Sequence, residues 1–155
     1  MGIAIVVWSF YAFLQKPAPE RYQEKINNLQ QTIDDKEQRI LKIGENELQV
    51  ELADTEEKRV QGLSGRETLE SGHGILFLFE NPDFHGFWMK DMHFPIDIVW
   101  INEDSVVVGV EREVSPDTYP QIFSSNTKVK YVLEINSGEA SSLGIDIGSE
   151  LYLGY

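Results

Sequence analysis

The stretch ILFLF at positions 75–79 decides the fold class. It follows Gly72 and Gly74, and it offers no polar position on either side of an extended chain. A continuous apolar run of this length, bounded by glycines, is typical of a strand that is covered on both faces. The stretch therefore predicts a β-sheet with other parts of the chain packed on each side.

Further short runs of β type lie on both sides of this stretch, separated by turn residues. Before it, we expect a hairpin over 40–52 that turns at 44–46, and a short helix that a capping box opens at Asp54 and that ends near Gly62. After it, the expected strands are 87–92, 96–102, 106–114, 129–135 and 148–153, with turns at 81–83 and 102–105 and a short helix at 139–143. Many short strands with one or two small helices predict a mainly β fold, either a compact antiparallel β-sandwich or a partly closed barrel.

The charge of the chain is concentrated in this region. Residues 44–155 contain seven Lys or Arg and twenty-one Asp or Glu, a net charge of −14, whereas residues 1–43 contain six against five. A domain this negative repels phosphate backbones, so we expect no nucleic-acid partner. The sequence contains no cysteine, which excludes disulfides, thiolate metal sites and cysteine nucleophiles within it.

Residues 2–14 form an apolar run in which Ser9 is the polar interruption. Thirteen helical residues reach about 20 Å, less than the roughly 30 Å hydrocarbon core of a bilayer. No basic region precedes the run and no small-x-small cleavage site follows it. Three interpretations stand: a membrane anchor over 1–16, which we favour, a cleaved signal sequence, or a hydrophobic helix buried in the domain.

Residues 17–42 are expected to form a helical stalk or linker between this run and an acidic domain over 43–155. Pro17 and Pro19 break the chain, and a helix can restart at Pro19. Apolar residues then recur at 22, 26, 29, 33 and 40, a seam shorter than a secure coiled coil requires. The segment is therefore either a solvated spacer or, over 20–42, a coiled coil through which the chain forms a homo-oligomer.

Several strings of the acidic domain, taken in order, resemble the Domain of Unknown Function 192 (DUF192) family. They are ELA (51–53), RVQGLSGR (59–66), GILFLF (74–79), FWMKDM (87–92), PIDI (95–98) and YVLEIN (131–136), with Gly138, Gly144 and Gly148. The resemblance covers about residues 40–153. It implies a compact, mainly β domain that in prokaryotes often follows a signal sequence or membrane anchor, and it brings no established activity. On this basis we expect the domain on the extracytoplasmic side, although Lys16, Arg21 and Lys25 favour the opposite orientation.

Two carboxylates stand inside apolar strand stretches, Asp97 within PIDIVWI and Glu134 within YVLEI. A carboxylate among buried aliphatic side chains costs several kcal/mol unless it is paired or hydrogen-bonded. One interpretation is structural: each carboxylate holds a loop by binding Arg59, Arg66 or backbone amides. The other is functional: both line a pocket together with Trp88.

No combination of residues matches a known catalytic or metal-binding motif. The spacing of His73, His85 and His93 suits no compact set of metal ligands, and GLSG at 62–65 does not fit the G-x-S-x-G pattern. We interpret Trp88 and Trp100 as core residues, because both interrupt apolar runs.

The sequence therefore favours a binding or interaction module over an enzyme, with no cofactor and with a protein or a small molecule as its partner. The candidate binding residues are Arg59, Arg66, Trp88, Lys90, Asp97 and Glu134. The alternative is a small enzyme whose pocket is formed by Trp88, Asp97, Glu134 and the long loop over 115–126.

Overall fold

The computed structural model describes Arg21, residues 23–25 and residues 38–153. The chain divides into two compact units, Met1–Lys36 and Glu37–Tyr155. In the first unit, Arg21 and residues 23–25 are helical. The expected anchor over 2–14 and most of the expected stalk over 17–42 lie outside the described residues. None of the helices described is both long and apolar enough to cross a membrane.

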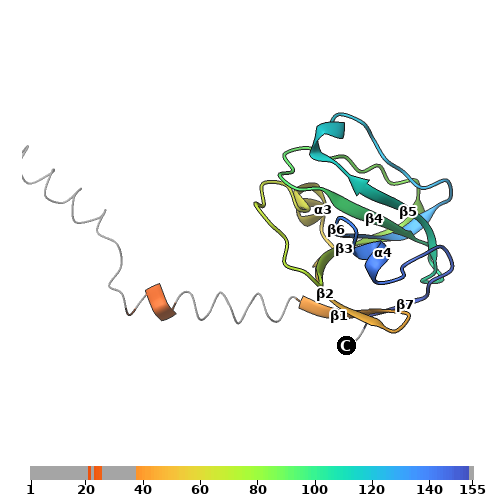
Figure 1. The fold of residues 1–155 in the computed structure, drawn as a ribbon, viewed down its shortest axis with the longest axis horizontal. Helices are drawn as coiled ribbons and strands as arrows, with labels where there is room; N and C mark the ends of the chain where they lie inside the picture. Colours follow the sequence, from red (N-terminus) through yellow and green to blue (C-terminus); the bar gives the residue numbers. More distant parts are fainter. Residues whose placement is uncertain (1–20, 22, 26–37, 154–155) are drawn as a thin grey trace, which may run out of the picture. The chain divides into compact units, whose positions relative to one another are not determined.

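The second unit contains one sheet of seven strands (Figure 1). Its elements, in chain order, are β1 (Gln38–Ile43), β2 (Asn46–Ala53), α3 (Glu56–Gln61), β3 (His73–Asp83), β4 (Ile96–Ile101), β5 (Val107–Val114), η1 (Pro116–Thr118), β6 (Val129–Asn136), α4 (Glu139–Ser142) and β7 (Leu151–Leu153). The strands lie in the order β5-β4-β6-β3-β2-β1-β7. The fold is therefore mainly β, as expected, and β1 begins within the range assigned to the stalk.

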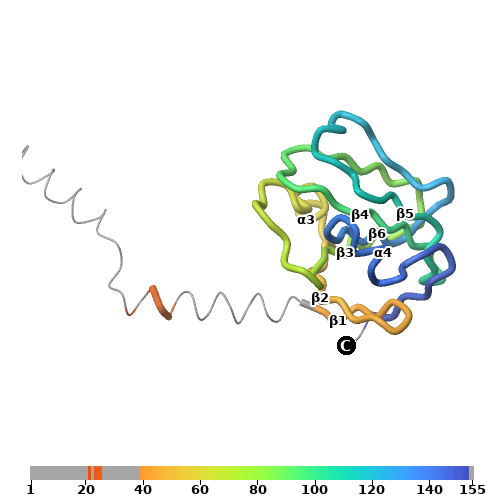
Figure 2. The backbone as a smooth tube through the Cα atoms, viewed as in Figure 1, coloured from red at the N-terminus to blue at the C-terminus, as the bar shows by residue number. Residues whose placement is uncertain are grey.

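The sheet is mixed and curls into a half-barrel, which agrees with the expected partly closed barrel and corrects the expectation that all of its strands are antiparallel. β2 and β3 pair in parallel, whereas the other neighbouring strands are antiparallel. A parallel pair needs a crossover, and α3 supplies it. The two edge strands approach each other at one end, where the amides of Val107 and Leu151 donate to the carbonyl oxygens of Ser149 and Ser105. The sheet is thus a curled half-barrel, as the tube in Figure 2 shows.

Each face of the sheet is covered by its own hydrophobic cluster. Neighbouring residues along a strand point to opposite faces, so that Leu76 and Leu133 belong to one cluster and Phe77 and Val132 to the other. The first cluster also contains residues of β1, β2, β5 and β7, because the sheet curls around it. The second lies beneath the segments that follow α3 and β3. ILFLF is therefore covered on both sides, as its sequence predicts.

Four local predictions need correction. The expected strand over 87–92 makes a single bridge, between Phe87 and Phe123, because the chain turns at Asp91, where φ is +56°. Trp88 is 54% exposed instead of lying in the core, although Trp100 is buried as expected. The cap of α3 is Thr55 and not Asp54, since the Thr55 hydroxyl accepts from the Lys58 amide. Finally, β3 continues through the expected turn at 81–83.

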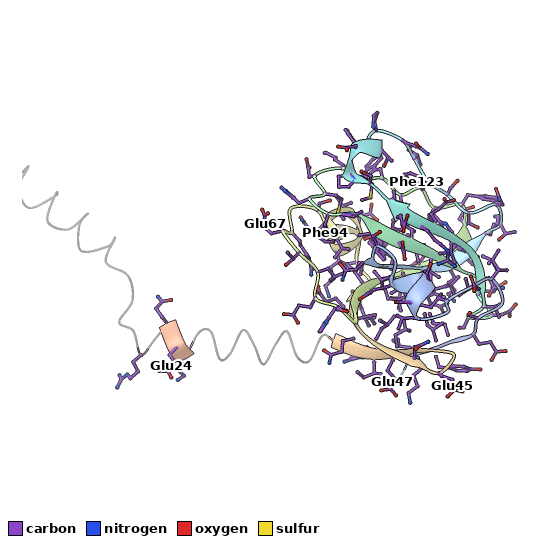
Figure 3. The ribbon with its side chains drawn as sticks, viewed as in Figure 1. Glu24, Glu45, Glu47, Glu67, Phe94 and Phe123 are labelled. Atoms are coloured by element: carbon purple, nitrogen blue, oxygen red, sulfur yellow. The ribbon has the colours of Figure 1, made fainter. Side chains whose placement is uncertain are left out.

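The acidic side chains are distributed over the surface of the domain. Figure 3 shows Glu67 projecting far from Glu45 and Glu47. Within the described part of the chain, no group of three or more His, Asp or Glu side chains could hold a metal ion.

Asp97 on β4 is fully buried and joins three elements. Its Oδ1 accepts a hydrogen bond from the amide of Glu113, 2.8 Å away, and its Oδ2 accepts one from the amide of Ala140, 2.9 Å away. Glu113 lies beside an irregularity in the β4–β5 register and has a φ of +54°, so the sheet leaves its amide without a strand partner. Asp97 thus stabilises a β-bulge and fixes α4 against the sheet. Of the two interpretations offered for the buried carboxylates, the structural one therefore applies to Asp97, with backbone amides as its partners.

We predict that Asp97→Ala destabilises the domain. One buried and one partly buried amide would lose their acceptor, which corresponds to roughly 3 kcal/mol and a fall in Tm of roughly 10 °C. Asp97→Asn should have a smaller effect, because its carbonyl oxygen can still accept from one of the two amides. Differential scanning calorimetry measures both variants, with the exposed strand residue Glu80 replaced by Ala as the control. An Asp97→Ala protein with the same Tm as the wild type would contradict this role.

Candidate functional site

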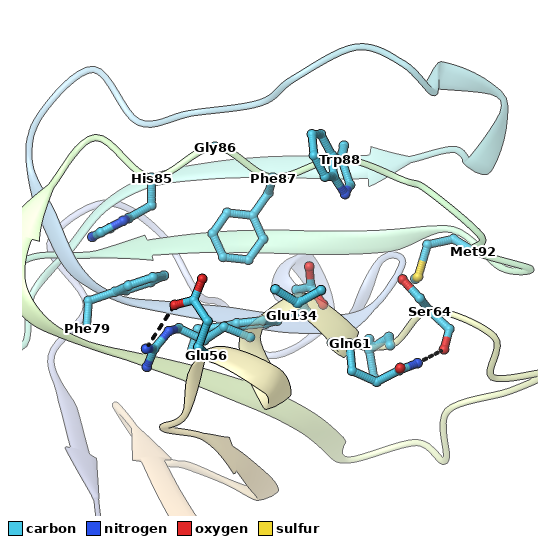
Figure 4. Close-up of a pocket in the computed structure, with 15 residues that line it drawn as sticks. Glu56, Gln61, Ser64, Phe79, His85, Gly86, Phe87, Trp88, Met92 and Glu134 are labelled. Carbon is cyan, nitrogen blue, oxygen red and sulfur yellow. Dashed lines mark hydrogen bonds and ion pairs between the residues drawn. The ribbon is translucent and has the colours of Figure 1, made fainter.

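A cavity of about 260 Å³ opens on the face of the second cluster (Figure 4). Three parts of the chain supply its lining: α3 with the residues that follow it, strands β3 and β6, and the irregular segment after β3. The lining residues are Glu56, Arg59, Val60, Gln61, Gly62, Leu63, Ser64, Phe77, Phe79, His85, Gly86, Phe87, Trp88, Met92 and Glu134. Apolar and aromatic side chains predominate, with a small number of polar groups among them, as in many ligand pockets.

Aromatic rings form much of the wall. Phe87 packs edge-on against Phe77, with 4.8 Å between ring centroids, and also against Trp100, at 5.4 Å. His85 stacks on Phe79 with nearly parallel rings 3.4 Å apart. Burial lowers the pKa of His85 below its ordinary value near 6.5, so this ring is neutral at pH 7. The wall therefore presents neutral aromatic surface.

Glu134 is the buried acid of this cavity. Its position on β6 pairs with Ile75 of β3 on one side and with Ile98 of β4 on the other. The side chain is 6% exposed, and among the described residues its carboxyl has no hydrogen-bond partner. Burial raises its pKa from 4.5 to about 8, against a smaller opposing effect of the Arg66 charge. The carboxyl is therefore mostly protonated at pH 7 while it lines an open space.

The other charged groups of the lining are already engaged. Arg59 donates from Nη1 to the carbonyl oxygen of Leu78, 2.9 Å away, and its Nη2 lies 3.7 Å from the carboxylate of Glu56. Its guanidinium also lies over the Phe79 ring, 5.5 Å from the centroid. Because the Glu56 side chain is exposed, this ion pair contributes little to stability. It does, however, give both charges a partner other than Glu134.

Gly62 allows the end of α3 to approach the sheet closely. Its φ is +49°, and its amide donates to the carbonyl oxygen of Lys58, which ends the helix. A Cβ at this position would lie 3.2 Å from Phe77 and 3.9 Å from Oε2 of Glu134. Glycine is therefore favoured both by the backbone conformation and by the close approach to Phe77.

The structure brings three of the six candidate binding residues together: Arg59, Trp88 and Glu134 all line the cavity. Asp97 lies on the opposite face of the sheet, because it pairs with Ile135 and not with Glu134. Asp97 and Glu134 therefore do not share a pocket.

The other two candidates, Arg66 and Lys90, are not in the lining either. Both oxygens of Glu51 accept from Arg66, at 2.6 and 2.7 Å, so Arg66 has a bidentate partner of its own. Lys90 contacts the lining residue Ser64 through its backbone, because its carbonyl oxygen accepts a hydrogen bond from the Ser64 hydroxyl at 2.9 Å.

The long loop over 115–126 supports the cavity without lining it. Two backbone hydrogen bonds of 2.9 and 2.8 Å join Phe87 and Phe123, and a Cβ on Gly86 would lie 2.9 Å from Ile122. The loop thus holds the wall segment in place from behind. No pattern in the sequence identifies the wall residues Phe79 and Phe87 or the neutral His85 as part of a site. A pairing register between β3 and β6 would have been needed to place them around Glu134.

We predict that Glu134 makes the domain less stable as the pH rises. Because the folded state holds this proton up to about pH 8 and the unfolded state releases it near 4.5, unfolding becomes easier between these values and the effect levels off above pH 8. Glu134→Gln removes the titration, so its free energy of unfolding relative to wild type should increase by about 2 kcal/mol or more from pH 5.5 to 8. Urea unfolding of both proteins across this pH range measures the difference in their free energies of unfolding. The contributions of the other titratable groups cancel in this difference. Parallel pH profiles would contradict the assignment.

Comparisons with known proteins agree with this fold. A crystal structure of a candidate transcription regulator from Sinorhizobium meliloti is 30% identical, with a TM-score of 0.71 over 75% of this chain and 93% of that one. A protein of unknown function from Novosphingobium aromaticivorans is 28% identical, with a TM-score of 0.67 over 74% of this chain and 83% of that one. No curated protein matches the chain. The profile of the DUF192 family (Uncharacterized ACR) matches residues 39–153. The chain therefore belongs to the DUF192 family, as the resemblance in its sequence indicated.

Proposed function

We propose that this domain is a binding module whose cavity takes a small ligand, or one side chain of a partner protein. The observation that carries the proposal is Glu134, a buried carboxyl that faces an aromatic cavity without a hydrogen-bond partner among the described residues. The carboxyl oxygens of Glu134 are open to the cavity, so a ligand group that enters it can reach them and supply the hydrogen bond that the described chain does not.

The size of the cavity limits what it can take. At about 260 Å³, it lies just below the roughly 300–1,000 Å³ typical of pockets for drug-sized molecules. A fragment-sized compound or a single long side chain fits such a space. Val60 and Trp88, which are 75% and 54% exposed, add apolar surface to its lining where a partner could pack.

An enzyme remains the second candidate, because a carboxyl with a pKa of about 8 is suited to general acid–base catalysis near neutral pH. Such catalysis usually needs a second positioned group. In the described part of the chain, Ser64 donates to a backbone oxygen and Arg59 is bound to Glu56 and Leu78, so neither is held against Glu134. A binding role therefore accounts for more of the site.

We further propose that residues 2–14 attach the domain to a membrane, with the domain on the extracytoplasmic side. The apolar run supports the attachment, and the family resemblance supports the extracytoplasmic side. The transcription-regulator description of the Sinorhizobium protein is not carried over, since a net charge of −14 on residues 44–155 opposes binding to nucleic acid.

We predict that closing the cavity weakens ligand binding. Val60→Trp places a bulky side chain on an exposed helix position of the lining, while Ile147→Trp makes the same type of change at a position equally exposed, at 74%, that is not part of the lining. A mixture of benzamide, benzylguanidinium and benzoate is titrated against each full-length protein, with binding followed by NMR. Wild type and Ile147→Trp should bind at least one fragment next to Trp88 and Glu134, and Val60→Trp should bind at least about tenfold more weakly. If no fragment shifts the signals of the lining residues, the proposed function is wrong.

The tether has a separate test. Val6→Glu together with Phe10→Glu places two charges in the apolar run, and each charge disfavours membrane insertion by roughly 3 kcal/mol. The double variant should move from the membrane pellet to the supernatant after cell lysis, whereas a Gln30→Glu, Gln31→Glu control should stay with the membranes. A wild-type chain that fractionates with soluble proteins would contradict the proposal.

A further inference from the structure

We propose that the cavity selects a cation, an ammonium or guanidinium group on an apolar stem, with the carboxylate of Glu134 as its counter-ion. This inference rests on the proposed binding function and names the class of ligand. It follows from the charge pairing inside the cavity, from the chemistry of the wall and from the charge of the domain.

Charge pairing inside the cavity leaves Glu134 without a cation. Of the two carboxyls in the lining, Glu56 lies 3.7 Å from Arg59 and is satisfied within the chain. Glu134, buried to more than nine-tenths, has no such contact among the described residues. The strongest interaction that a ligand can add here is therefore a charge-assisted hydrogen bond to this carboxylate.

The wall already accommodates a guanidinium. Arg59 lies over the face of Phe79, within the distance at which the ring attracts a cation. Phe87 and Trp88 offer two more aromatic side chains in the same lining. An ammonium or guanidinium ligand would therefore find aromatic surface around its charge, and its stem would find apolar surface at Val60.

The charge of the whole domain acts in the same direction. Residues 44–155 carry a net charge of −14, which raises the local concentration of cations and lowers that of anions. An anionic ligand would have to approach against this field and replace Glu56 as the partner of Arg59. A neutral ligand would gain nothing from the field.

Binding of a cation is coupled to loss of a proton from Glu134. The charged and titratable groups that line the cavity with Glu134 or act on its charge are Arg66 after α3, Glu56 and Arg59 on α3, and His85 after β3. Arg66 is held by Glu51, and His85 is neutral at pH 7, so neither supplies a close positive charge to Glu134. Glu134 therefore keeps its proton at neutral pH and releases it when a cation binds.

The experiment compares benzylguanidinium, benzamide and benzoate, which share one ring and differ in charge. A guanidinium stays protonated throughout the range used. For wild type, the Kd of benzylguanidinium should fall about tenfold between pH 7 and pH 9, as Glu134 ionises, and isothermal titration at pH 7 in two buffers should show proton release. Benzamide and benzoate should bind more weakly than benzylguanidinium at pH 9.

Two variants identify the carboxylate. Glu134→Gln should lose the tightening at high pH and bind benzylguanidinium at least about tenfold more weakly at pH 9 than wild type. Glu56→Gln, which removes the other carboxyl of the lining, should keep the tightening. Loss of the pH effect in Glu56→Gln but not in Glu134→Gln would overturn the assignment, as would benzoate or benzamide binding more tightly than the cation.

The outcomes also separate this inference from the function on which it rests. If benzamide or benzoate occupies the cavity and benzylguanidinium does not, the binding module stands and the cation inference is wrong. If none of the three binds, both are wrong. If benzylguanidinium binds as expected, a blocked alanine pentapeptide with one central arginine distinguishes two sources of the cation. Tighter binding of the peptide than of benzylguanidinium indicates a side chain of a partner protein. Weaker binding of the peptide indicates a small molecule.

Discussion

The pairing register of β4 with β6 is the constraint on which both faces of this domain depend. Asp97 lies opposite Ile135, and the next residue of β4, Ile98, lies opposite Glu134. Because side chains alternate along a strand, this register sends the two buried carboxyls to opposite faces of the sheet. A slip of one residue between these two strands would turn one of them over and place both carboxyls on the same face of the sheet.

The two carboxyls offset the free-energy cost of burial in different ways. Asp97 receives two backbone amides, each of which contributes roughly 1.5–3 kcal/mol as a hydrogen bond to a charged acceptor. Glu134 receives no hydrogen bond from the described residues and avoids the cost of a buried charge by keeping its proton. The same sheet therefore contains one carboxylate whose role is complete in the folded chain and one carboxyl whose capacity for an ion pair is unused. This contrast distinguishes a residue that holds the fold from one that can serve a ligand.

Local patterns in the sequence were sufficient for most of the elements. The apolar run at 75–79, the hairpin of β1 and β2, and the short helix before Gly62 all follow from spacing and turn residues. The parallel pairing of β2 with β3 did not, because a local pattern does not select the partner strand. The segment 87–92 alternates like a strand, yet it turns at Asp91, so Trp88 lies on the surface. The apolar strand patterns single out both Asp97 and Glu134, but only the pairing register shows that the two side chains lie on opposite faces.

The base of the cavity belongs to the sheet, whereas its walls are irregular backbone. The two parts therefore determine different properties of a ligand. Glu134 is fixed by two neighbouring strands, so the position of its carboxyl and its preference for a charge are set by the sheet. The wall around Phe87 belongs to a segment without regular structure that backbone hydrogen bonds join to the loop at Phe123. Loops of this kind tolerate changes in length and sequence more readily than the strands that support them. Changes in the two loops would therefore alter which apolar stem the cavity accepts, while the sheet would continue to set the charge of the group that binds.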